Sequence, residues 1–404
     1  MDTSVKWYHS GMPGIGSIRY DGNSIDTSFL SVLNNVLFSG FNSQAAVSCS
    51  VSNGVATIEF GRAHGFSPFS VVEVSGASNP AINGEKRVLS APTSSSLTVL
   101  ATGVSDGPVS GSISVKYAPA GWDRVFPITS NAIAFRTNPQ SPRASFAYQF
   151  EATGTSMYHR LRIFQNLTGV NSGQLLVDTG SFPLSRYLVI GTYTYPFIIV
   201  ASNETMYIFF TGTNAFPFNS PPTINNGSVT MFGNGAPLSS SDVWFGCLSW
   251  IDSVPAATPA NRGGNLEFCG APSGGFFWAG RSYTGGVAGV GLTHAMESFY
   301  SGTAGASGGS GVGAVSAYPN GPDTSLILTR KAIFEGSHLR GFAPGLYMTP
   351  QNCAQQFSQM QIVDGQGALA GRKLLAVRCG SGSEISPAPG VVFFDITGPW
   401  SYTP

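Results

Sequence analysis

Charged side chains are scarce in this chain of 404 residues, at 10% of the sequence, where about 25% is usual. Twenty Lys and Arg balance twenty Asp and Glu, and the basic residues form no run. Phosphate binding needs a concentrated basic surface, because affinity rises with the number of phosphates that are neutralised. We therefore expect no nucleic-acid partner. Exposed helix faces are usually built from Lys, Glu and Arg, so a mostly helical protein is also disfavoured.

The spacings that mark common metal and cofactor sites are missing. The five cysteines include no C-x-x-C pair, and the five histidines include no i, i+4 pair. The glycine-rich stretch 285–291 lacks both a preceding strand and the later acidic residue of a dinucleotide-binding loop. The closest strings to a serine-nucleophile elbow lie in a low-complexity stretch. We expect no cofactor, no metal site, no catalytic residue, and cysteines that are buried free thiols.

No hydrophobic run is long enough for a membrane helix, which needs about 20 apolar residues. The most apolar stretch, 187–201, is interrupted by Gly191 and Pro196 and is typical of two buried strands. The first six residues lack the charged and then apolar order of a signal peptide. These features predict a protein without a membrane span that is made in a cytoplasm.

Glycine, proline and aromatic residues are abundant instead. The chain has 51 Gly and 26 Pro, and aromatic residues make up 12% of it. Short alternating apolar runs recur between Gly, Asn, Asp and Pro turn signals, as in all-β proteins. The predicted fold class is all-β, with several β-sandwich or barrel-like modules, one short N-terminal helix and long Gly/Ser-rich loops.

Three regions are expected along the chain. Residues 1–45 are expected to form an N-terminal attachment arm and helix, and residues 46–118 a small Ig-like β module. Its five expected strands fit a small sandwich or a barrel. Residues 119–404 form a large β-rich domain, long enough to be subdivided, with a flexible loop near 284–316.

The helix is expected between Asp26, which can cap its first turn, and Gly40, which suits its C-terminal end. Five apolar residues fall on one stripe of it: Phe29, Leu30, Leu33, Val36 and Leu37. The arm before it would need a partner surface to bury Trp7 and Tyr8.

Carboxylates are the candidate catalytic groups that are hardest to exclude from the sequence. A glycosidase needs only two carboxylate residues, and the fold can bring them together from distant parts of the chain. The possible members are Glu59, Glu73, Asp178, Asp252, Glu267, Glu297, Glu335 and Asp364. Nothing in their spacing selects a pair, so we expect a protein that is not an enzyme.

Aromatic rings in an uncharged Gly/Ser/Asn setting suit carbohydrate or protein recognition, because they offer apolar area at low entropic cost. The candidate receptor surface consists of Tyr193, Tyr195, Phe276, Phe277, Trp278, Arg281 and Tyr283. Packing in the core is the alternative for each ring.

Several strings resemble proteins encoded in the tail gene clusters of siphophages and prophages. The opening K-W-Y-H-S-G-M-P-G (6–14) is similar to their W-x-H-S-x-M-P-G start. The stretch 53–88 is similar to a small β module common in them, and 367–373 with 394–400 are similar to their C-terminal ends. The resemblance is weakest between about 160 and 350.

The resemblance implies a virion protein of the tail tip or baseplate, either receptor-binding or fibre-like. It implies a homo-oligomer, often a trimer, and zero net charge independently favours assembly. Other tail or baseplate proteins and a host receptor, glycan or protein, would be its partners. The proposed tail-attachment residues are Trp7, Tyr8, His9, Met12 and Pro13.

Three alternatives stay open at this point. A purely architectural baseplate protein would never touch the host, and a glycan-degrading tail enzyme would use a carboxylate pair. A secreted bacterial adhesin is disfavoured by the missing signal peptide.

Overall fold

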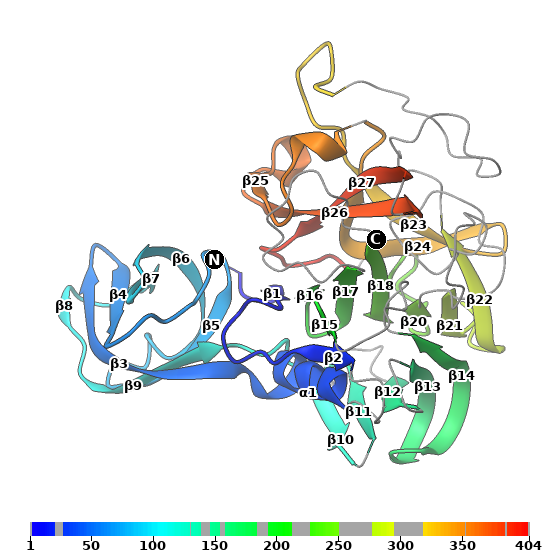
Figure 1. The fold of residues 1–404 in the computed structure, drawn as a ribbon, viewed down its shortest axis with the longest axis horizontal. Coiled ribbons are helices and arrows are strands. Elements are labelled where there is room, and N and C mark those ends of the chain that lie inside the picture. The colour runs from blue at the N-terminus through cyan, green and yellow to red at the C-terminus, as the bar shows by residue number, and fades with distance from the viewer. Residues whose placement is uncertain are drawn as a thin grey trace.

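Antiparallel strands dominate the computed structural model, which confirms the all-β prediction. The structure describes residues 2–20, 27–129, 131–138, 146–153, 158–183, 193–211, 227–249, 277–294, 318–351, 353–383 and 386–402. Within them the chain forms a small barrel on one side of a larger body, with the N-terminus at the junction (Figure 1). The expected loop near 284–316 falls largely outside these residues.

The small module is a closed antiparallel barrel. A barrel was one of the two forms that the strand spacing allowed, but the Ig-like arrangement predicted for the module is wrong. Its six strands are β3 (Phe41–Ser52), β4 (Val55–Phe60), β7 (Ser96–Leu100), β6 (Gly84–Thr93), β5 (Val71–Ala77) and β9 (Gly111–Tyr117), with β8 (Gly107–Pro108) beside β3. The ring closes because the long strand β3 shifts register between Ala46 and Ser48. This bulge lets β3 pair with β4 along one part and with β9 along another.

Local sequence explains the hairpin that starts the barrel. Alternate residues of β4, namely Ala56, Ile58 and Phe60, are buried, as the period of two requires. Asn53 and Gly54 have φ angles of 52° and 74°. These left-handed conformations are what a tight two-residue hairpin between β3 and β4 needs.

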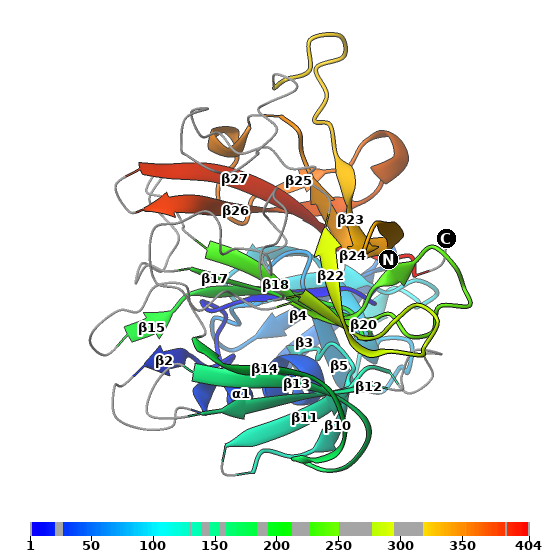
Figure 2. The ribbon, with the colours of Figure 1, turned by 90° about the vertical axis from the view of Figure 1, so that its right-hand side faces the viewer.

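One large antiparallel sheet runs through the main body. Its order is β1 (Lys6–His9), β16 (Phe197–Ala201), β17 (Thr205–Thr211), β18 (Gly227–Asn234), β20 (Gly246–Ser249), β21 (Phe277–Arg281), β22 (Ala288–His294), β23 (Thr329–Glu335), β24 (His338–Met348), β27 (Ser386–Asp395), β26 (Lys373–Ser383) and β25 (Ile362–Asp364). A short strand, β19 (Ala236–Pro237), pairs with β24. The sheet curves, so that β26 and β27 lie over β17 and β18 (Figure 2).

A second sheet lies on the other side of β17 and β18 (Figure 2). It consists of β10 (Asp123–Phe126), β11 (Ala132–Arg136), β12 (Phe146–Ala152), β13 (Tyr158–Gly169) and β14 (Ser172–Pro183). Two short strands, β2 (Ile18–Tyr20) and β15 (Tyr193–Tyr195), form a separate pair. Two short 3-10 turns also lie in the described part of the body, η3 (Ala354–Gln356) and η4 (Gly367–Leu369).

The predicted N-terminal helix is confirmed. Helix α1 (Ser28–Asn34) continues into one π-helical turn, η1 (Asn35–Ser39), and Gly40 ends it with a φ of 70°. All five residues of the predicted stripe are buried. Asp26 lies outside the described residues, and Thr27, which occupies the N-cap, makes no side-chain capping bond. None of the described helices is long and apolar enough to cross a bilayer.

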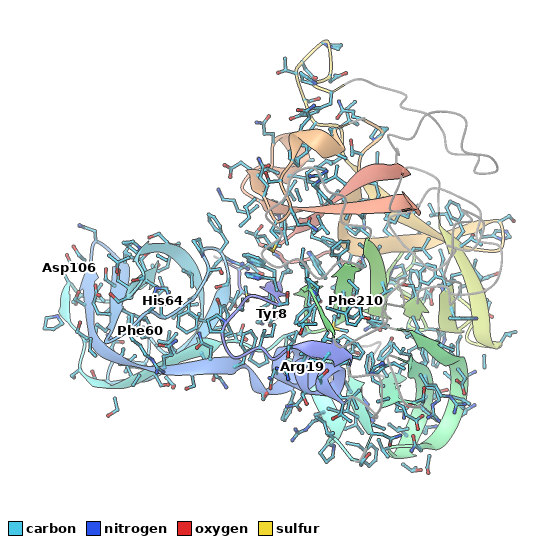
Figure 3. All side chains as sticks on the ribbon, viewed as in Figure 1. Tyr8, Arg19, Phe60, His64, Asp106 and Phe210 are labelled. Carbon is cyan, nitrogen blue, oxygen red and sulfur yellow. The ribbon has the colours of Figure 1, made fainter. Side chains whose placement is uncertain are left out.

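The N-terminal segment is not the free arm that the sequence suggested. Strand β1 adds to the edge of β16, and Trp7 and Tyr8 are 5% and 1% exposed within this same chain. The Tyr8 hydroxyl donates to the Ala118 carbonyl at 2.7 Å, where the barrel meets the body (Figure 3). The expected partner surface is therefore supplied internally, because β16 offers both unpaired backbone groups and apolar side chains.

Candidate binding site

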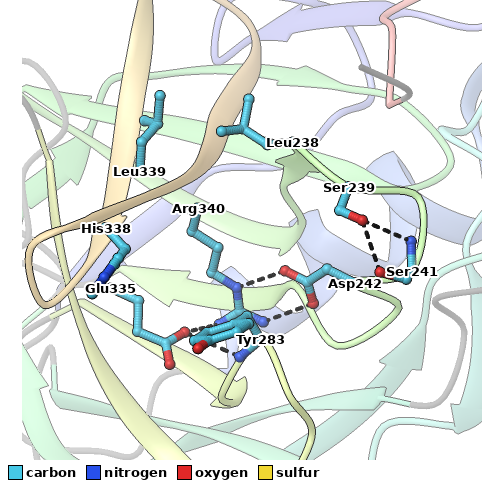
Figure 4. A pocket seen from close by; sticks show the side chains of 9 residues that line it. All are labelled: Leu238, Ser239, Ser241, Asp242, Tyr283, Glu335, His338, Leu339 and Arg340. Carbon is cyan, nitrogen blue, oxygen red and sulfur yellow. Dashed lines mark hydrogen bonds and ion pairs between the residues drawn. The ribbon is translucent and has the colours of Figure 1, made fainter.

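A cavity of about 260 Å³ opens on the large body (Figure 4). Three loops surround it: the segment after β19, the turn after β21, and the β23–β24 hairpin. Its lining residues are Leu238, Ser239, Ser241, Asp242, Tyr283, Glu335, His338, Leu339 and Arg340. The hairpin holds the first loop in place, since Leu238 N–H donates to the Arg340 carbonyl at 2.9 Å.

Arg340 lies at the base of the cavity with a side chain that is 1% exposed. Its guanidinium binds Asp242 in a bidentate manner, from Nε to Oδ2 at 2.8 Å and from Nη2 to Oδ1 at 3.0 Å. Its Nη1 donates to the Arg281 carbonyl at 2.8 Å and to Glu335 Oε2 at 2.9 Å. The ring of Phe245 lies 4.7 Å from the guanidinium carbon. Buried charges persist when paired and hydrogen-bonded in this way.

The carboxylates of Asp242 and Glu335 differ in whether an oxygen remains to accept a hydrogen bond from a ligand. Both oxygens of Asp242 accept from Arg340, and Oδ1 also accepts from Trp244 N–H at 3.1 Å. Glu335 uses Oε2 for both Arg340 and the N–H of Tyr283. Its Oε1 makes no hydrogen bond to any side chain or backbone group within the described ranges. One arginine against two acids leaves these three charged side chains with a net charge of −1.

The rim of the cavity is apolar and hydroxylated. Tyr283 is 57% exposed, Leu238 44% and Leu339 37%, and His338 is also exposed. Ser239 and Ser241 face each other with their hydroxyl oxygens 2.7 Å apart. The opening therefore combines an aromatic ring, aliphatic side chains and hydroxyl groups.

Hydrogen bonds of the Arg281 side chain stabilise the turn that carries Tyr283. Arg281 donates from Nη1 to the Gly285 carbonyl at 3.0 Å and from Nε to Gln165 Oε1 at 2.9 Å. Gly285 has a φ of 76°, and a Cβ there would lie 2.4 Å from Trp244 Nε1. Only glycine suits both the backbone conformation and the close approach.

The residues predicted to form a receptor surface lie in different environments. Tyr283 is at the cavity and exposed, whereas Arg281 is half-buried and supports its turn. Tyr195 and Phe277 are only 2% and 1% exposed, so their prediction as surface residues is wrong. Both belong to strands whose apolar side chains pack into the core, which was the alternative for each ring. Trp278 is half-buried against the core, and Phe276 and the Tyr193 side chain lie outside the described residues.

The proposed attachment residues mostly lie inside the molecule. Met12 is 3% exposed and is therefore almost fully buried, as Trp7 and Tyr8 are. His9 is half-buried. Only Pro13 of the five is exposed. Attachment to a tail through this segment stays a prediction, and it would use residues other than the two large rings.

The cavity includes residues that sequence reasoning missed. Arg340, Asp242 and His338 were not singled out, although Glu335 was one of eight candidate acids. A usable signal did exist, because Glu335, His338 and Arg340 fall within six positions of a chain that is poor in charge. Asp242 gave no such signal, since only the fold brings it to Arg340.

The described His, Cys, Asp and Glu residues form no metal site, and the described cysteines are unreactive. In the part of the chain that the structure describes, no three His, Cys, Asp or Glu residues could hold a metal ion together. The four cysteines described, Cys49, Cys247, Cys353 and Cys379, are buried thiols, as predicted, and Cys269 lies outside that part. Burial raises the pKa of Cys247 to about 12 and that of Cys353 to about 11, which makes both poor nucleophiles.

Comparisons with known proteins do not identify a family for this chain. No protein-family model matches the sequence, and no curated protein matches it. The fold is weakly similar to that of a solved phage protein, phage phi92 endosialidase, at a TM-score of 0.18 and 10% identity. That similarity covers 88% of this chain and 52% of the endosialidase chain.

Proposed function

We propose that this chain is a structural protein of a tailed-phage tail tip or baseplate that binds the host surface through the cavity around Tyr283. The observation that carries the proposal is the cavity itself, which joins an exposed ring and two exposed leucines to hydroxyl groups over a buried ion-pair base. Rings and hydroxyls of this kind recognise glycans and proteins at low entropic cost.

The position of the cavity supports this proposal. Its residues lie between 238 and 340, within the stretch where the resemblance to phage tail proteins is weakest. The strings that carry the resemblance have structural roles, since Trp7 and Tyr8 fill the core and Trp400 is 6% exposed. Host recognition would then belong to the part of the chain that differs from the family pattern.

Binding without catalysis is part of the proposal. Glycoside hydrolysis needs two carboxyl groups that both face the scissile bond. Asp242 has both oxygens engaged by Arg340, which leaves only Glu335 with an unoccupied oxygen at this cavity. Three other candidate acids, Glu73, Asp178 and Asp364, form ion pairs with Lys116, Arg160 and Lys373 in other parts of the chain.

The first experiment measures binding of the purified protein to intact host cells, with mass and oligomeric state determined on the same sample. We expect saturable binding by a stable homo-oligomer, which we propose to be a trimer. Replacing Tyr283 with Ala should weaken cell binding about tenfold or more, because a central exposed ring carries much of such an interface. Val47→Ala is the control, since Val47 is 68% exposed on the barrel, away from the cavity.

The other functions predict different results. A folded oligomer that binds no cells would support a purely architectural baseplate role. Clearing of host lawns by the purified protein would support a glycan-degrading enzyme. A monomer that neither binds nor assembles would contradict a virion role, and with it the proposed virion location.

A further inference from the structure

We propose that the cavity selects a sugar ring that bears a protonated amine and discriminates against acidic sugars. This inference rests on the proposed host-binding role and adds the chemical class of the ligand. It follows from which polar atoms of the lining are already used and which are open.

The single buried cation of the cavity is not available to an anion. Four of the five N–H groups of the Arg340 guanidinium donate to Asp242, Glu335 and the Arg281 carbonyl. Because the side chain is only 1% exposed, a ligand carboxylate could reach the guanidinium only by displacing one of these partners. Losing a partner of a buried charge is costly, so acidic ligands are disfavoured.

Among the charged groups at the base of the cavity, Arg340, Asp242 and Glu335, the one open polar atom is an acceptor. Glu335 is 13% exposed, and its Oε1 has no partner within the described residues, while Oε2 anchors both Arg340 and Tyr283 N–H. Its carboxylate is therefore held in place with one oxygen to spare. An ammonium group would satisfy that oxygen with a charge-assisted hydrogen bond and cancel the net negative charge of the lining.

The remaining walls suit the body of a sugar ring. The backbone N–H of Tyr283 itself donates to Glu335 Oε2 at 3.2 Å, which brings this residue beside the carboxylate. An ammonium group bound at Oε1 would therefore also lie near the aromatic ring of Tyr283, and aromatic rings attract cations. Leu238 and Leu339 offer apolar surface to C–H groups, and Ser239 and Ser241 offer hydroxyls to ring hydroxyls (Figure 4). The volume of about 260 Å³ is below the roughly 300 to 1,000 Å³ of drug-sized pockets, which favours a single ring unit.

The test compares three pyranoses that differ in charge: glucosamine, glucose and glucuronic acid, titrated into the full-length protein at pH 7 and low salt. We expect glucosamine to bind about tenfold more tightly than glucose, and glucuronic acid to bind most weakly. The Glu335→Gln variant keeps an oxygen for Arg340 and Tyr283 but removes the charge, so the preference for glucosamine should fall to less than about twofold. Glu85→Gln is the matched control, because Glu85 pairs with Lys6 at 3.0 Å at the barrel and should leave the preference intact.

Tyr283→Ala provides a second variant, since an exposed side chain is removable without loss of the fold, and it should weaken binding of all three sugars. Equal affinities, a preference for glucuronic acid, binding of none of the three, or an unchanged preference in a folded Glu335→Gln variant would overturn the inference. Cell binding by the wild-type protein in any of these cases would leave the proposed function standing. Absence of cell binding would instead count against that function.

Discussion

His9 is held in a setting that suits only its neutral form. Its Nδ1 accepts a hydrogen bond from Gly11 N–H at 3.1 Å, and its ring stacks on Trp7 with centroids 5.7 Å apart. Burial lowers the pKa of His9 from 6.5 to about 4. Protonation of Nδ1 would break the bond to Gly11 and place a charge beside a buried indole.

The low pKa predicts a pH-dependent contribution to stability. The unfolded chain takes up a proton near pH 6.5 and the folded chain only near pH 4, so the contribution is fully present above pH 6.5. It is lost as the pH falls from about 6.5 to 4, and its size is about 3 kcal/mol. Urea unfolding of the wild type and His9→Asn at pH 7.5 and 4.5 measures it, because the Asn oxygen can replace Nδ1 as acceptor.

Carboxylates that titrate in the same range affect both proteins alike and cancel in the comparison. We expect the stability gap between wild type and variant to move in favour of the variant at pH 4.5. Parallel losses in the two proteins would show that His9 does not titrate as its burial implies.

At the scale of elements, helix α1 joins the two sheets of the main body. The ring of Phe29 lies 6.2 Å from Phe150 on β12, 5.0 Å from His159 on β13 and 5.9 Å from Phe210 on β17. The first two belong to the five-stranded sheet and the third to the large sheet. Phe29 is fully buried between them.

Removing this ring should leave a cavity between the sheets. Phe29→Ala is expected to cost about 3 to 5 kcal/mol of unfolding free energy, as for other large buried rings. Phe38→Ala, in the adjoining turn η1, is the control: Phe38 is 41% exposed and lies under Arg124 at 4.4 Å. Its loss should cost about 1 kcal/mol or less. Similar denaturant midpoints for the two variants would contradict the bridging role of Phe29.

At the scale of the whole molecule, Arg87 connects three distant parts of the chain. This barrel residue is 3% exposed and donates to carbonyls of the N-terminal segment, at Asp2 (2.9 Å) and Val5 (3.0 Å). It also donates to carbonyls near the C-terminus, at Ile396 (2.8 Å) and Thr397 (3.3 Å), and to Phe69 of its own barrel. Burial lowers its pKa to about 10, which still leaves it charged at neutral pH.

A lysine cannot reproduce this set of bonds, because it has three donors on one atom in place of a planar fork. Arg87→Lys should therefore cost about 3 kcal/mol or more, since several buried carbonyls lose their partners. We also expect the barrel to unfold separately from the body, seen as a second transition in calorimetry. Lys86→Met is the control, because Lys86 bonds only to Ala81 within the barrel, at 2.7 Å. A single unchanged transition in Arg87→Lys would disprove the connecting role.

Much of the local structure was predictable because it depends on neighbours in the sequence. The stripe Phe29, Leu33, Val36 identified the helix, and the alternation Ala56, Ile58, Phe60 identified a strand. Aromatic residues were harder to place. Tyr283 and Phe277 have similar sequence surroundings, yet one is 57% and the other 1% exposed. That difference is set by the face of β21 on which Phe277 lies and by the turn that carries Tyr283.

The all-β class, the N-terminal helix and many of the turns could be predicted from the sequence, because composition, apolar period and glycine conformation act over a few residues. Long-range packing was needed to close the small module into a barrel, to place β1 on the edge of β16 and to form the cavity. The Asp242–Arg340 pair at the base of that cavity joins residues 98 positions apart. The physical reason is that strand edges and buried charges pair with residues far away in the sequence, and local periodicity contains no information about which distant residues those are.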